Sequence, residues 1–138
     1  IHPQERGPPT LSFISCENLP CFRGRESMDY KYLSIAAYGS HLYCAPWYAP
    51  DVLVIDSGSS TVMSVPCGGG GYQRGDHGWS GIAACGGRLY CAPFRGSTSI
   101  LVIDPTSNSL RLWPVGEGGY FGVTQHAGSG KLFCAPAD

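Results

Sequence analysis

Cysteine, histidine and aspartate are the residues of this chain whose chemistry could go beyond packing. Three of the seven cysteines, Cys44, Cys91 and Cys134, stand in the same short word, Leu-(Tyr/Phe)-Cys-Ala-Pro. A structural zinc site needs ligands that converge tetrahedrally, usually from a Cys-x-x-Cys or a close histidine pair. The chain has neither pattern, so we predict no bound metal and no cofactor.

The same cysteines do not predict a disulfide framework. Their total is odd, and equivalent positions in stacked sheets lie about 10 Å apart, beyond the ~7 Å Cα separation that a disulfide spans. Small buried thiols that fill space between sheets are the expected role. Free thiols are typical of a reducing compartment, so we expect an intracellular location, an organelle included.

Asp76 and His77 form the one adjacent acid–base doublet that suggests catalysis. A hydrolytic or transfer enzyme needs a nucleophile with a base, or paired acids. No Ser-His-Asp pattern with a recognisable context accompanies the doublet, so we predict a non-catalytic protein.

An internal repeat of roughly 45 residues must position these groups. The cysteine word occurs at 42–46, 89–93 and 132–136. The other words of each unit are a first word at 32–37, 79–84 and 120–124, a third at 52–56 and 100–104, and a fourth at 61–66 and 109–114.

Each word is short and rich in β-branched and aromatic residues, as β-strands are. Glycines between the first and second words predict tight hairpin turns. Asp56 and Asp104 follow the third word, where a carboxylate can cap the turn by an Asx-turn. Each unit is therefore predicted to be a four-stranded antiparallel meander.

The third word is apolar without alternation, which indicates a strand covered on both faces. Sheets stacked around an axis provide such cover, and the period favours an all-β fold of β-propeller blades. A β-sandwich, which also buries strands, is the alternative. The chain 1–138 is then a single array: 10–16 is the last strand of a blade, 32–67 and 79–115 are blades, and 120–136 is a half blade.

About two and a half blades cannot close a ring that takes typically 4–8 blades. We therefore expect an incomplete ring, completed by further polypeptide or by other chains. The chain begins at Ile1 without a signal-peptide pattern, so a processed or partial chain is expected.

The pattern aromatic-x-Gly-Ile-Ala, Leu-Tyr-Cys-Ala-Pro and Leu-Val-Ile-Asp-Pro resembles blades of Kelch-like and YVTN-type propeller proteins. The Cys-Ala-Pro variant is similar to repeat proteins of algae and other protists. The resemblance covers roughly residues 10–136 and implies a fold rather than an activity. The units lack the Gly-Gly doublet with a Tyr/Trp pair of true Kelch repeats and the Trp-Asp ending of WD40 blades.

Loops that join the second to the third strand, and the fourth to the next first strand, lie at the same end of such an array. Aromatic and arginine side chains, which are enriched at binding hot spots, gather in these loops. The alternative is that the aromatic side chains only pack over the edges of the sheets. The candidate binding residues are Trp47, Tyr48, Asp51, Arg74, Asp76, His77, Phe94 and Arg95.

The function predicted is a protein-interaction scaffold, a fragment or subunit of a larger multi-protein assembly, an organellar complex included. Its protein partners are expected to cover the open blade faces. With 9 Lys+Arg against 10 Asp+Glu and no basic stripe, nucleic acid is not expected as a partner. No run is long enough to span a membrane. The alternatives are a fragment of a lactonase or sugar-oxidising propeller enzyme, with acidic or metal-binding groups near Ser34, Gly81 and Gly122, and a small-ligand sensor.

Overall fold

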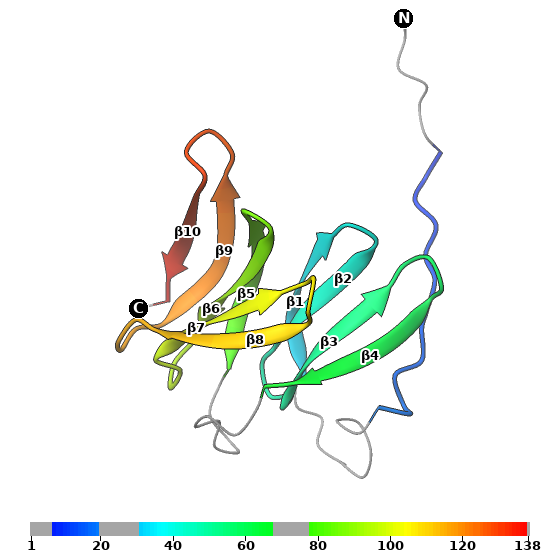
Figure 1. The fold of residues 1–138 in the computed structure, drawn as a ribbon, viewed down its shortest axis with the longest axis horizontal. Coiled ribbons are helices and arrows are strands. Elements are labelled where there is room, and N and C mark those ends of the chain that lie inside the picture. Colours follow the sequence, from blue (N-terminus) through cyan, green and yellow to red (C-terminus); the bar gives the residue numbers. More distant parts are fainter. Residues whose placement is uncertain (1–6, 20–30, 68–77, 138) are drawn as a thin grey trace, which may run out of the picture.

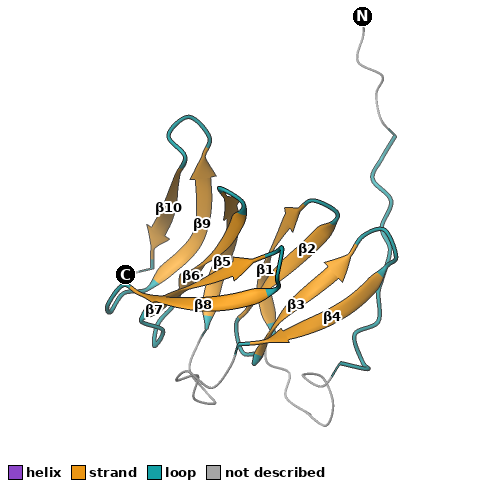
Figure 2. Cartoon of the chain, in the orientation of Figure 1, coloured by secondary structure: helices purple, strands orange, loops and turns teal. Residues whose placement is uncertain are grey.

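The regular structure of the protein consists of β-strands in a computed structural model that describes residues 7–19, 31–67 and 78–137. Figures 1 and 2 show strands and connecting loops, with no helix in the described segments. The strands are β1 (Tyr32–Tyr38), β2 (His41–Pro46), β3 (Asp51–Asp56), β4 (Thr61–Pro66), β5 (Trp79–Cys85), β6 (Arg88–Pro93), β7 (Ser99–Asp104), β8 (Ser109–Pro114), β9 (Tyr120–His126) and β10 (Lys131–Pro136).

The strands form three antiparallel sheets in which sequence neighbours pair. β1–β4 make the first sheet, β5–β8 the second, and β9 with β10 the third. No sheet closes into a barrel among the described residues. The predicted strands within the repeat units are confirmed to within two residues at each end, and the sheets stand side by side along the array (Figure 1).

Turn chemistry sets the strand ends as the sequence predicted. The β5–β6 hairpin turns through Gly86 and Gly87, whose φ angles of 56° and 80° suit glycine. In the β3–β4 turn, Asp56 Oδ1 accepts a hydrogen bond of 2.8 Å from the Gly58 N–H. Asp104 caps the β7–β8 turn in the same way, at 2.9 Å. These local bonds fix where each strand stops and the next begins.

The core lies between the first and second sheets, which pack face to face. The third strands are buried on both faces: three successive residues are buried in each, Val52, Leu53 and Val54 in β3 and Leu101, Val102 and Ile103 in β7. This confirms the expectation drawn from their unbroken apolar character. The buried cluster consists of Tyr43, Ala45, Val52 and Val54 of the first sheet and Trp79, Ile82, Leu89, Cys91, Leu101 and Ile103 of the second.

The first strands of successive sheets touch, since β1 contacts β5 and β5 contacts β9. A Cβ placed on Gly81 would lie 2.5 Å from the Cα of Gly122, so the two backbones meet without side chains between them. The absence of side chains at Gly81 and Gly122 therefore lets β5 and β9 approach closely.

Ser80 ties the second sheet to the third. Its Oγ donates to the backbone carbonyl of Tyr120 and lies 3.3 Å from the Gly122 N–H, from which it accepts. Ser80 is only 7% exposed, so these bonds also satisfy a buried hydroxyl.

The segment 10–16 differs from its prediction, because the structure assigns no strand there. Leu11 and Phe13 are 86% and 97% exposed. A fourth strand pairs with the edge of a third strand, and the edges of β3 and β7 are already taken by β4 and β8. The sequence pattern of 10–16 therefore has no such edge to pair with in the described structure.

Candidate interaction surface

Two predicted aromatic residues, Trp47 and Phe94, form a row of rings with Phe121, which was not predicted, and the row crosses all three sheets. The Trp47 and Phe94 ring centroids lie 4.5 Å apart, and those of Phe94 and Phe121 lie 4.7 Å apart. Trp47 and Phe94 are 7% and 8% exposed, whereas Phe121 is 53% exposed. Trp47 and Phe94 thus pack between sheets, and only the last ring of the row is open to a partner.

Backbone bonds hold Trp47 and Phe94 at the same place in the first and second units. The Trp47 N–H donates to the Lys31 carbonyl at 2.9 Å, and the Phe94 N–H donates to the Gly78 carbonyl at 3.1 Å. The Gly78 N–H donates to the Trp47 carbonyl at 2.8 Å, which links the first sheet to the second. The loops after β2 and β6 are therefore held in place by backbone hydrogen bonds to the residues that precede β1 and β5.

The other predicted residues of these loops differ in accessibility. Tyr48 is half-buried and meets the Trp47 ring edge-on, with centroids 6.1 Å apart. Asp51 is half-buried at the start of β3, where its carbonyl accepts the Tyr32 hydroxyl at 3.1 Å. Arg95 is exposed beside Phe94 in sequence.

Arg74, Asp76 and His77 lie outside the described residues. Their grouping with Trp47 and Phe94 at one end of the array stays a prediction.

The third sheet exposes repeat positions that the other sheets bury. Cys44 and Cys91 are 6% and 0% exposed, but the equivalent Cys134 is exposed. Tyr43 is 2% exposed, but the equivalent Phe133 is 54% exposed. The expectation that all three cysteines are buried is therefore wrong for Cys134, because β10 has no third strand beside it and no further sheet over it in the described structure.

Phe121 and Phe133 were missed as surface residues because their words match those of the buried units. The signal that could have found Phe133 is the strand count, since a unit with two words cannot cover its own second strand. Leu33 and Ile35 of β1 are also exposed, at 45% and 56%, although the first sheet has four strands.

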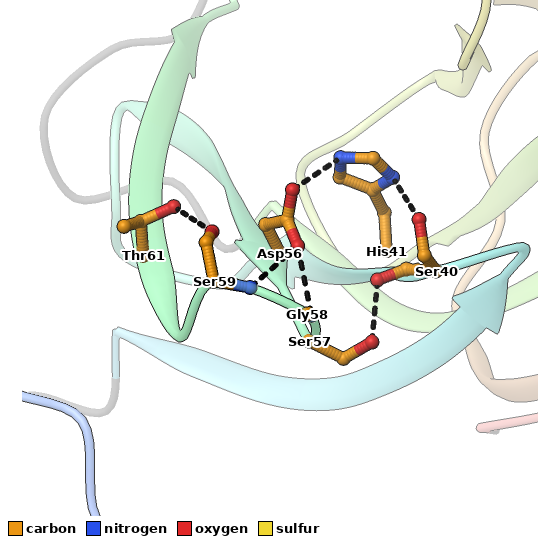
Figure 3. A network of polar contacts seen from close by, with 7 residues as sticks. All are labelled: Ser40, His41, Asp56, Ser57, Gly58, Ser59 and Thr61. Atoms are coloured by element: carbon orange, nitrogen blue, oxygen red, sulfur yellow. Dashed lines mark hydrogen bonds and ion pairs between the residues drawn. The ribbon is translucent and has the colours of Figure 1, made fainter.

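A polar network lies at the β1–β2 and β3–β4 turns of the first sheet, at the other end of the strands from the loop that follows β2 (Figure 3). Ser40 Oγ lies 3.3 Å from His41 Nδ1, and His41 Nε2 lies 3.5 Å from Asp56 Oδ2. The N–H groups of Ser59 and Gly58 bond to Asp56 Oδ1 and, with the nearby His41, hold the pKa of that carboxyl below its usual range.

These residue types match those of an acid–base–nucleophile set, but here their contacts stabilise the β1–β2 and β3–β4 turns. The His41 and Asp56 side chains are 41% and 38% exposed to solvent. One carboxylate oxygen of Asp56 is already hydrogen-bonded to the N–H groups of the turn. The second unit repeats the capping role with Asp104, while Gly87 and Arg88 stand where the first unit has serine and histidine. The shared part of the network is structural.

Five cysteines of the described segments, Cys44, Cys67, Cys85, Cys91 and Cys134, are free thiols. Burial raises the pKa of Cys44 to about 11, with a smaller effect of the neighbouring Cys16. Burial raises the pKa of Cys67 to about 12, assisted by the charge of Asp51 and opposed by a hydrogen bond from the Val52 N–H. Burial also raises the pKa of Cys91. A protonated, buried thiol is a poor nucleophile, so these side chains serve packing.

Among residues 7–19, 31–67 and 78–137, no group of three or more His, Cys, Asp or Glu side chains is placed to hold a metal ion. Within the same ranges, no helix has the length and apolar character to cross a membrane. Comparison with protein-family models gave no match, and neither did comparison with curated proteins.

Proposed function

We propose that this chain is an array of Kelch-like β-propeller blades that serves as a non-catalytic protein-interaction scaffold, as a fragment or subunit of a larger multi-protein assembly. Sequence-ordered antiparallel meanders that touch through their first strands support the propeller arrangement. The free thiols of Cys44, Cys67, Cys85, Cys91 and Cys134 support an intracellular location, where disulfides are rare.

The observation that carries the proposal is the open third sheet. Phe133 is 54% exposed where the equivalent Tyr43 is 2% exposed, and Cys134 is exposed where Cys91 is 0% exposed. Exposed apolar patches and unpaired strand edges are the usual marks of a surface that meets another protein. Phe121, 53% exposed at the end of the aromatic row, extends the same surface.

The contact between the first strands disfavours the alternative of a propeller-enzyme fragment. Such an enzyme would place acidic or metal-binding side chains near Ser34, Gly81 and Gly122. A Cβ on Gly81 would lie 2.5 Å from the Gly122 backbone, so no larger side chain fits between β5 and β9 at that point.

Size-exclusion chromatography with light scattering tests the proposal on the purified chain. We expect concentration-dependent association through the open third sheet, because burying a phenylalanine side chain contributes about 1.5–3 kcal/mol. Phe133→Ser should weaken this association at least about tenfold, which corresponds to roughly 1.4 kcal/mol.

Phe13→Ser is the matched control, since Phe13 is 97% exposed in a segment without a strand. Circular dichroism of both variants checks that the fold is retained. A chain that stays monomeric and soluble at every concentration, with both variants indistinguishable from it, would contradict the proposal.

A further inference from the structure

We propose that Cys67 and Cys91 form a reversible disulfide that joins the first sheet to the second, with a small-molecule disulfide as the oxidant. The inference goes beyond the proposed function and does not depend on it, because both cysteines lie at the internal contact between two four-stranded sheets. It assigns a redox modification site to two side chains that serve packing in the reduced chain.

The Cys67 side chain lies on the face of the first sheet that packs against the second. Its N–H donates to the Pro50 carbonyl at 3.2 Å, which extends the β3–β4 ladder by one residue. Side chains alternate between the two faces along a strand, so Cys67 shares its face with Val65, and both pack against the buried cluster between the sheets. The Val52 N–H also donates to the Cys67 thiol, which holds the sulfur at this face.

Cys91 projects from the facing surface of the second sheet. It is two residues from Leu89 in β6, so both side chains share a face, and both are 0% exposed members of the same buried cluster. Burial and, to a smaller extent, the nearby Cys67 raise the pKa of Cys91. The two thiols therefore lie in one layer of side chains between the sheets.

The separation that argues against disulfides elsewhere in the repeat does not apply to this pair. Equivalent positions of stacked sheets lie about 10 Å apart, but Cys67 and Cys91 are not equivalent positions. They come from facing surfaces, whose side chains interdigitate within a single layer. Disulfides that join two facing sheets in this way occur in β-sandwich domains.

A related pair of cysteines recurs at the first sheet. Cys44 is the equivalent of Cys91, and Cys16, which ends the segment with the composition of a fourth strand, is close enough to contribute to the raised pKa of Cys44. At the end of the second unit, Val115 stands in the place of Cys67. Valine is thus an apolar residue that the repeat itself uses at this position, and it provides a conservative variant for the test.

The reaction is a two-step thiol–disulfide exchange. The thiolate of Cys67, which is half-buried and therefore the more accessible of the two, attacks one sulfur of the oxidant and releases one thiolate. The thiolate of Cys91 then attacks the Cys67 sulfur of this mixed disulfide and releases the second thiolate. Two protein thiols are oxidised, the oxidant is reduced to two thiols, and the protons of the two cysteines pass through solvent to the released thiolates.

The exchange is expected to be slow. Burial raises the pKa of Cys67 to about 12, assisted by the charge of Asp51, so only a small fraction of this thiol is ionised near neutral pH. Disulfide formation in proteins takes from seconds to hours, and we expect this one to take hours.

The test is oxidation of the folded full chain with glutathione disulfide, followed by alkylation of the remaining thiols and tandem mass spectrometry of the digest. We expect a cross-linked peptide that joins Cys67 to Cys91 and that a reductant releases. Cys67→Val should abolish this peptide. Cys85→Val is the matched control, since Cys85 is also half-buried, and it should leave the yield unchanged. Circular dichroism checks that both variants retain the fold.

Urea denaturation of the oxidised and the reduced chain gives a second readout. We expect oxidation to lower the equilibrium constant of unfolding at least about thirtyfold, because a disulfide restricts the unfolded chain. The Cys67→Val variant should show no such change after the same treatment.

The inference is overturned if the oxidised chain carries glutathione at Cys67 without a bond to Cys91, or if the cross-link forms equally well in the chain unfolded in urea. A cross-link that leaves the urea midpoint unchanged would also contradict it. None of these outcomes bears on the self-association of the chain through Phe133, so the proposed function is tested separately.

Discussion

At Gly81 the absence of a side chain lets two sheets meet through their backbones. The sequence placed small residues at this point of each unit, and the structure explains them, because a Cβ here would lie 2.5 Å from Gly122. The hydrogen bonds of Ser80 to β9 were not predictable. Their partner, Tyr120, is 40 residues further along the chain in another sheet, and the repeat alone does not give the distance between two sheets.

We expect Gly81→Ala to lower the free energy of unfolding by about 1–3 kcal/mol, as overpacking does in a filled interior. Urea denaturation followed by circular dichroism measures the change. Gly7→Ala is the control, because nothing lies within 4 Å of a Cβ at Gly7. Equal stability of the two variants would show that the backbones do not meet as described.

At the scale of the elements, the strands could be predicted almost entirely, whereas the roles of the loop residues could not. Turn residues and apolar words locate each strand. Trp47 and Phe94 were candidates for binding because they follow the second strand in a loop, yet they pack into a row with ring centroids 4.5 Å apart. A single loop sequence does not reveal that the next unit places an aromatic ring beside it.

Phe94→Ala should therefore act on stability, with a loss of about 3–5 kcal/mol, as for other large-to-small changes in an interior. Phe121→Ala should cost less, because that ring is 53% exposed. Thermal and urea denaturation of both variants measure the difference. An unchanged stability of the Phe94→Ala variant would contradict the packing role and would favour Phe94 as a surface binding residue.

At the scale of the whole molecule, residues with similar sequence words differ in structure from unit to unit. The segment 10–16 has the composition of a fourth strand, but the described residues contain no third strand with an open edge for it, so its pattern does not decide its structure. Cys134 shares its word with Cys91 but lacks the neighbouring strand that covers Cys91. Cysteines in nearly identical sequence words thus have different environments, because the burial of a side chain depends on the next strand and the next sheet.

Native-state alkylation of the thiols, mapped residue by residue at low protein concentration, tests the open third sheet most directly. Cys91 is 0% exposed, whereas Cys134 is exposed. Burial raises the pKa of both thiols, that of Cys91 well above its usual value. We predict that Cys134 is modified at least about tenfold faster than Cys91, because reaction requires an accessible thiolate. Equal protection of Cys134 and Cys91 would mean that the third sheet is already covered, and would contradict the account.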